Sequence, residues 1–168
     1  MMLLLRLFVI STLLLNMNGC GDKNALKSTS TSSAASSTDA DLIKLEQFIN
    51  LPVQPVRVQW AMNKVTEPVG KLGVEDWSIV ARMELDEKDL KILTNIPLPN
   101  KVVKLPKYAI EPWMDDVIAS KFKLDKSGQS YRPLGIMLSA EQFYRDPLVT
   151  GAIYMITDTE ILLFLQTK

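Results

Sequence analysis

The side chains able to do chemistry are few in this chain. Among its 168 residues there is no histidine, and Cys20 is the single cysteine. Without histidine, the usual general base near neutral pH and the commonest protein ligand for metals are missing. An enzyme built on this sequence would depend on carboxylates, on a serine paired with a lysine, or on a metal held by oxygen atoms. The acidic candidates are Glu75 with Asp76, Asp86 with Glu87 and Asp89, Asp115 with Asp116, and Asp158 with Glu160.

These acidic groups do not form a site through their spacing. Adjacent residues of a helix or strand point in different directions, so a neighbouring pair does not converge on one substrate atom. Helix capping and solvation account for them instead. The sequence also lacks the spaced Asp-x-Asp-x-Asp-Gly loop of an EF-hand calcium site. We therefore predict that the protein is not an enzyme and that it holds neither a metal nor a cofactor.

The first twenty residues have the pattern of an export signal. Arg6 precedes an apolar run from Leu7 to Leu15, and the small residue Gly19 comes directly before Cys20. A positive charge, a short apolar segment and a small residue in this order are typical of a secretory signal peptide. Two alternatives to a lipidated signal stay open: a signal cleaved without lipidation, and a retained membrane-spanning helix, which needs about 20 apolar residues.

Met17-Asn18-Gly19-Cys20 resembles the lipobox of bacterial lipoproteins, in which the cysteine after a small residue is lipidated. The resemblance implies that residues 1–19 are a signal peptide and that Cys20, carrying palmitate and other acyl chains, becomes the first residue of the mature chain. Two or more acyl chains hold a protein stably on a membrane. The implied location is the bacterial cell envelope, facing the periplasm. Because Gly21 rather than Asp follows the cysteine, the resemblance favours the outer membrane.

The rest of the chain has the composition of one domain behind a spacer. Residues 20–40 are rich in serine and threonine and carry little apolar surface, which predicts a flexible spacer. Residues 41–168 are long enough to bury one core. The 19 basic and 19 acidic residues balance and alternate along the chain. Nucleic acid is therefore not an expected partner, since its binding proteins gather a basic excess on one face.

Hydrophobic periodicity predicts strands interleaved with helices. We expect an amphipathic helix over residues 40–50 that packs on the core, and strands over 55–63 and 77–85 that pair and place Trp60 and Trp77 in one buried layer. Asp86 is expected to cap a short helix that ends at Leu93. The proline-rich stretch 95–111 predicts a loop with a short edge strand near Val102 and Val103.

The second half of the chain continues the same alternation. We expect a helix over residues 112–123, a turn over 126–129, a strand with Leu134, Ile136 and Leu138 on one face, and one helical turn that begins at Ser139. The last two strands, 152–156 and 161–166, are expected to form a hairpin. Strand 161–166 is apolar on both faces, so it should be central and covered by helices on one side. The sequence thus predicts an α+β fold, with a mostly antiparallel sheet of four to six strands and two or three helices packed on it.

The remaining candidates for function are aromatic. Trp and Tyr are enriched at binding hot spots, but the periodic placement of Trp60 and Trp77 assigns them to the core. Trp113, which has acidic neighbours at the head of its helix, and Tyr144 with Arg145, which lie in an expected turn, are the candidates for surface contact.

A strong anchor combined with absent catalytic groups leads to a binding function. We expect an envelope lipoprotein whose domain serves as a binding or accessory module for another envelope component, with a protein as partner and the membrane contacted through the lipid on Cys20. The alternatives are a protective lipoprotein, which confers immunity or excludes a toxin or phage, and an envelope enzyme that uses carboxylates on glycan.

Overall fold

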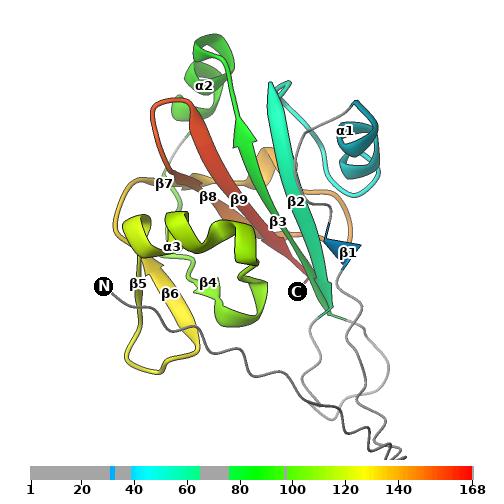
Figure 1. Ribbon diagram of the computed structural model, residues 1–168. Helices are drawn as coiled ribbons and strands as arrows, with labels where there is room; N and C mark the ends of the chain where they lie inside the picture. Colours follow the sequence, from blue (N-terminus) through cyan, green and yellow to red (C-terminus); the bar gives the residue numbers. More distant parts are fainter. Residues whose placement is uncertain (1–30, 33–38, 65–75, 97, 168) are drawn as a thin grey trace, which may run out of the picture.

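The computed structural model describes residues 31–32, 39–64, 76–96 and 98–167. They form a six-stranded sheet in the order β1-β2-β3-β9-β8-β7 and a three-stranded sheet in the order β4-β6-β5, with antiparallel pairing throughout (Figure 1). The predicted α+β class, with a mostly antiparallel sheet of up to six strands, is confirmed.

The bounds of the elements are as follows. The strands are β1 (Thr31–Ser32), β2 (Arg57–Lys64), β3 (Trp77–Glu84), β4 (Leu105–Pro106), β5 (Phe122–Leu124), β6 (Ser130–Pro133), β7 (Met137–Ser139), β8 (Thr150–Met155) and β9 (Glu160–Gln166). The α-helices are α1 (Asp39–Leu45), α2 (Glu87–Thr94) and α3 (Asp115–Lys121), and the 3₁₀ turns are η1 (Lys107–Ala109), η2 (Pro112–Met114) and η3 (Glu141–Phe143).

β9 is central in the large sheet and is buried on both faces. It pairs with β3 on one side and with β8 on the other, and all five residues from Ile161 to Leu165 are fully buried. Because successive side chains of a strand point to opposite faces, Ile161, Leu163 and Leu165 enter one core while Leu162 and Phe164 enter another. The predicted central position is confirmed, and the sheet has two covered faces rather than the expected one.

The first core lies under α1, α2 and η3. Leu45, Leu93 and Phe143 from these elements are fully buried in it. Trp60 and Trp77 belong to this layer, as predicted, and each packs against Phe48 with ring centroids 6.0 Å apart. At the start of α2, the Asp86 carboxylate accepts a hydrogen bond of 2.7 Å from the Asp89 amide, which confirms the predicted cap.

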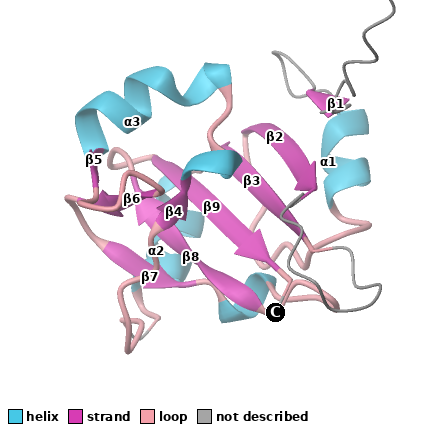
Figure 2. Ribbon diagram, turned by 90° about the horizontal axis from the view of Figure 1, so that it is seen from below, coloured by secondary structure: helices cyan, strands magenta, loops and turns pink. Residues whose placement is uncertain are grey.

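The second core lies on the opposite face of the large sheet. It is closed by η1, η2, α3 and the three-stranded sheet. Leu105 of β4, Val117 of α3 and Phe122 of β5 pack there with Leu162 and Phe164 of β9. Figure 2 shows α3 on this side of the large sheet. The small sheet is thus a second layer, with one side against the core and one side turned outward.

Several element bounds differ from the sequence expectation. Helix α1 ends at Leu45, and its expected last residues form a turn whose Ile49 still enters the core. Helix α3 ends at Lys121, because Phe122 leaves the helix to pack its ring 5.0 Å from that of Tyr154 in the second core. The expected edge strand occurs as β4, two residues after Val103.

The predicted strand through Leu134, Ile136 and Leu138 is wrong in its first half. Only Leu138 is buried, in β7, whereas Leu134 and Ile136 are 64% and 62% exposed in the connection from β6 to β7. The structure also differs within the expected spacer, where Thr31 and Ser32 form β1 and pair with Met62 and Ala61 of β2. An edge strand such as β2 offers unpaired backbone groups that a passing segment can satisfy. Among the described residues, no helix is long and apolar enough to cross a membrane.

Gly151 of β8 offers a test of this packing. A Cβ atom at this position would lie 2.0 Å from the Phe164 carbonyl oxygen and 2.9 Å from the Leu165 Cα. We predict that Gly151→Ala forces β8 away from β9 and lowers the free energy of unfolding by about 3 kcal/mol. Urea unfolding followed by circular dichroism measures the change. In the matched control, Gly135→Ala, the nearest atom to the new Cβ is 3.9 Å away, so equal losses in the two variants would contradict the close approach of β8 to β9.

Candidate functional site

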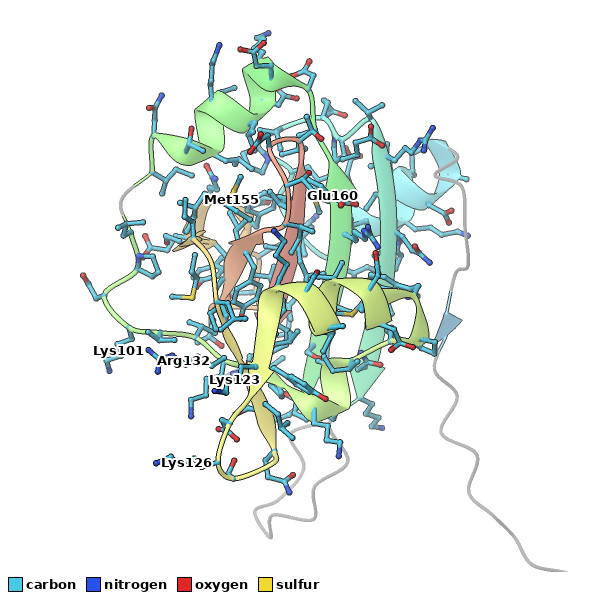
Figure 3. The ribbon with its side chains drawn as sticks, turned by 60° about the vertical axis from the view of Figure 1, so that its left-hand side comes forward. Lys101, Lys123, Lys126, Arg132, Met155 and Glu160 are labelled. Carbon is cyan, nitrogen blue, oxygen red and sulfur yellow. The ribbon has the colours of Figure 1, made fainter. Side chains whose placement is uncertain are left out.

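A groove rich in basic residues lies on the outward side of the three-stranded sheet. It has a volume of about 640 Å³, and four of its eight lining residues are lysine or arginine. We call it the basic groove; it is lined by Val102, Lys104, Lys123, Leu124, Asp125, Lys126, Ser127 and Arg132. Figure 3 shows Lys101, Lys123 and Arg132 on one side of the molecule, with Lys126 at the tip of the β5–β6 hairpin.

The strand register places three cations in one row. Lys123 of β5 is the direct cross-strand partner of Arg132 of β6. Their neighbours Phe122 and Tyr131 pack in the second core, so Lys123 and Arg132 point outward. On the other side of β6, Leu105 pairs with Tyr131, which puts Lys104 next to Arg132. The row therefore crosses all three strands.

Within this row, the Lys123–Arg132 pair is unfavourable for the isolated domain. Like charges directly opposite each other on a sheet are destabilising, and opposite charges contribute about 0.2–1 kcal/mol per pair. Both members of the Lys123–Arg132 pair are exposed, so solvent weakens their repulsion without removing it. An anion bound between the two side chains would turn this repulsion into attraction. The geometry therefore favours recognition of an anionic group.

Asp125 shapes one end of the groove. Its carboxylate accepts hydrogen bonds from the Ser127 hydroxyl at 2.6 Å, the Ser130 hydroxyl at 2.7 Å and the Lys104 ammonium at 2.9 Å. These bonds hold the pKa of Asp125 well below its usual range, with the Ser127 hydroxyl as the first cause. Gly128, at φ of 70°, lets the chain turn back toward β6. Asp125 thus fixes both the hairpin and the position of Lys104.

Aliphatic side chains stand beside these charges. Val102 and Leu124, which line the groove, are 57% and 47% exposed. The chain then runs directly from β6 into the exposed Leu134 and Ile136. Exposed aliphatic residues that stand singly need no explanation, but a group of them beside a basic surface is typical of an interaction site.

A second charged cluster has its charges already paired. Arg82 of β3 donates to the Glu160 carboxylate at 2.5 and 3.2 Å and to the Asp116 carboxylate at 3.2 and 3.3 Å. The hydrogen bond to Glu160 is the main cause that raises the pKa of Arg82. The two carboxylates come from distant segments, but one guanidinium engages both, and this joins α3 to the large sheet.

A Ser-x-x-Lys spacing, Ser120 to Lys123, was not among the candidates drawn from the sequence. Such a spacing can serve nucleophilic catalysis when the serine is activated by the lysine. Here the Ser120 hydroxyl donates to the Asp116 carbonyl at 2.7 Å within α3, whereas Lys123 lies on β5 and lines the groove. The pair is divided between a helix end and a strand.

The structure does not bring the predicted contact residues together. Trp113 is half-buried against the second core, and its indole N–H is buried without a hydrogen-bond partner in the described part of the chain. Tyr144 is half-buried against the first core, on the opposite face of the sheet, and its hydroxyl donates to the Gly151 carbonyl at 3.4 Å. Arg145 is exposed and donates to the Glu46 carbonyl at 2.6 Å, next to α1. Cys20 lies outside the described residues.

The basic groove was missed in the sequence because Lys123 meets Arg132 only through the β5–β6 pairing, and Lys104 joins them only through the β4–β6 pairing. A usable signal is present: Phe122-Lys123-Leu124 and Tyr131-Arg132-Pro133 alternate around a Ser-Gly turn. Within the described ranges, no group of three or more potential metal ligands gathers. No family model, curated protein or solved structure matches the chain.

The cost of the Lys123–Arg132 pair can be measured. We predict that Lys123→Glu and Arg132→Glu each raise the free energy of unfolding by about 0.5 kcal/mol, because each creates an opposite-charge pair. The double variant restores like charges and should lose this gain. Urea unfolding at low salt measures all four proteins. Additive effects of the two reversals would contradict a direct interaction.

Asp125 should make stability depend on pH. Since folding lowers its pKa, the stability that the carboxylate contributes is present above the unfolded value of about 3.9 and is lost as the pH falls toward the folded value. We predict that the wild type is more stable than Asp125→Asn at pH 7 and that the difference shrinks at about pH 3. Urea unfolding at the two pH values measures it. A difference that stays constant would contradict the lowered pKa.

Proposed function

We propose that the protein is a bacterial envelope lipoprotein, anchored through acyl chains on Cys20, and that its domain is a binding module for another envelope component. The first part rests on the resemblance of Met17-Asn18-Gly19-Cys20 to a lipobox. The second part rests on the basic groove, which we take as the binding surface of the domain.

The observation that carries the binding function is the row of Lys104, Arg132 and Lys123. The chain as a whole is electrically balanced, so a local excess of positive charge is not a consequence of composition. The direct Lys123–Arg132 pair costs stability in the free domain, and an anionic partner offsets that cost. The partner therefore carries phosphate or carboxylate groups.

The groove is prepared for such a partner before binding. β5 and β6 hold Lys123 and Arg132 on a paired backbone, and Asp125 holds Lys104 through an ion pair of 2.9 Å. Side chains that are positioned in advance lose less conformational entropy on binding. A basic surface of this kind also accelerates encounters with anions, and this acceleration falls as the salt concentration rises.

The anchor and the groove both contribute to binding an envelope component. Lipidation confines the domain to the membrane surface, which raises the effective concentration of any envelope component there. A groove that binds a single anionic group weakly in solution can then bind it to a useful extent.

Labelling with palmitate tests the anchor. We predict that cells incorporate labelled palmitate into the wild-type protein and that Cys20→Ala abolishes the label and moves the protein from the membrane to the soluble fraction. Detection on a gel of immunoprecipitated protein, followed by membrane fractionation, measures both effects. Label that persists in Cys20→Ala, or its absence from the wild type, would overturn the anchor.

Crosslinking in native membranes tests the groove as the binding surface. We predict that a photo-crosslinking side chain at position 124 captures an envelope component and that Lys123→Glu with Arg132→Glu abolishes the product. Lys88→Glu makes the same kind of charge change on α2, far from the hairpin in Figure 1, and should leave the product unchanged. Equal capture by the unaltered protein, the double charge-reversal variant and Lys88→Glu would contradict a binding role for the groove.

A further inference from the structure

We infer that the basic groove and the aliphatic residues beside it dock the domain onto the surface of an anionic phospholipid bilayer. This inference rests on the proposed function, because it names the envelope component that the groove binds. It adds a second membrane contact, made by the folded domain itself, to the lipid on Cys20.

Positive charge is concentrated at the groove. The groove contributes Lys104, Lys123, Lys126 and Arg132, and Asp125 is the one acidic residue among its lining residues. Lys101 extends the same side of the molecule (Figure 3). The Asp125 carboxylate forms an ion pair with Lys104 at 2.9 Å, so these two charges offset each other and the lining keeps an excess of three positive charges. Clusters of four or more basic residues at a membrane surface are attracted by anionic headgroups.

Exposed aliphatic side chains accompany these charges. Val102 and Leu124 line the groove, and Leu134 and Ile136 follow β6; all four are between 47% and 64% exposed. At a bilayer surface, aliphatic side chains enter the boundary between headgroups and acyl chains while lysine and arginine stay among the headgroups. The lining of the groove includes both kinds of side chain, and Leu134 and Ile136 follow directly on β6, so this region of the chain matches the boundary.

The combination favours a bilayer over two other occupants. A polyanion such as a phosphorylated glycan would use the cations but leave Leu134 and Ile136 in water. A nucleic acid would normally stack its bases on aromatic side chains, and the residues that line the groove include none. An acidic protein segment would also use the cations and is the remaining alternative. A bilayer uses both the cations and the exposed aliphatic side chains of the surface.

The position of the anchor permits this docking. The ~11 residues from Cys20 to Thr31 reach about 40 Å at most when fully extended. A domain of this size is about 35 Å across. The groove can therefore face the leaflet that holds the lipid. The basic contact then adds to the attachment that the acyl chains on Cys20 already provide.

Vesicle binding by the mature chain tests the inference. Residues 20–168 with Cys20→Ala keep every described element and remove the anchor, so any binding comes from the domain. The probes are sedimentable vesicles of phosphatidylcholine alone and of phosphatidylcholine with about 30 mol% phosphatidylglycerol. We expect binding to the anionic vesicles at least about tenfold tighter than to the neutral ones, and weakened at about 0.5 M NaCl.

Variants separate the two parts of the surface. Lys123→Glu with Arg132→Glu should weaken binding about 30-fold or more, because two attractive charges become repulsive. Leu134→Ser with Ile136→Ser leaves the charge unchanged and should weaken it about tenfold. Lys88→Glu on α2 should change it less than twofold. Urea unfolding of each variant verifies that the domain is still folded.

Three outcomes would overturn the inference. They are equal binding to both kinds of vesicle, binding that the charge reversals leave unchanged, and binding that the serine variants leave unchanged. The last would mean that charge alone attracts the domain, without the apolar contact that sets a bilayer apart from other anions. Lipidation of Cys20 is tested separately, by palmitate labelling. Vesicle binding without palmitate labelling would overturn the anchor alone, and palmitate labelling without vesicle binding would overturn the docking alone.

Discussion

The structure depends on the burial of β9 on both faces. A strand with five consecutive buried residues, Ile161 to Leu165, needs a covering layer on each side of its sheet. One layer is provided by α1, α2 and η3. The other is provided by α3, η1, η2 and the three-stranded sheet, which presents Phe122 and Tyr131 to the core. Because strand side chains alternate, the same strands must present Lys123 and Arg132 outward. The basic groove is thus the outer surface of a layer that the core requires.

The core does not determine which residue types occupy the outward positions of these strands. Lys123 and Arg132 face each other although opposite charges there would stabilise the hairpin. Natural proteins accept such local losses at functional sites. By contrast, Arg82 is satisfied by Glu160 and Asp116, so that cluster is explained by stability alone. The difference between these two clusters is the reason to place function at the groove.

The fold could be predicted from the sequence where a segment followed a single hydrophobic period, of a strand or of a helix. The alternation in β2 and β3, the cap at Asp86 and the apolar run of β9 each have a local cause. The end of α3 has no such local cause. Phe122 lies four residues after Ile118 and so fits a helix, but its position is decided by contact with Tyr154, which is far away in the chain. Missing β5 also hid the Lys123–Arg132 pair. Leu134 and Ile136 show the opposite error, since their apolar character predicted a buried strand and they are exposed.

The central claim is that the outer side of the small sheet is a membrane-binding surface, and residue-level mapping tests it most directly. Amide signals of the mature chain with Cys20→Ala would be recorded by NMR with phosphatidylcholine nanodiscs that contain or lack phosphatidylglycerol. The account predicts that the anionic nanodiscs selectively broaden signals from β5, β6, Lys104 and residues 134–136, and leave α2 unchanged. Broadening that centres on any other face of the domain, or that is uniform over the chain, would contradict it.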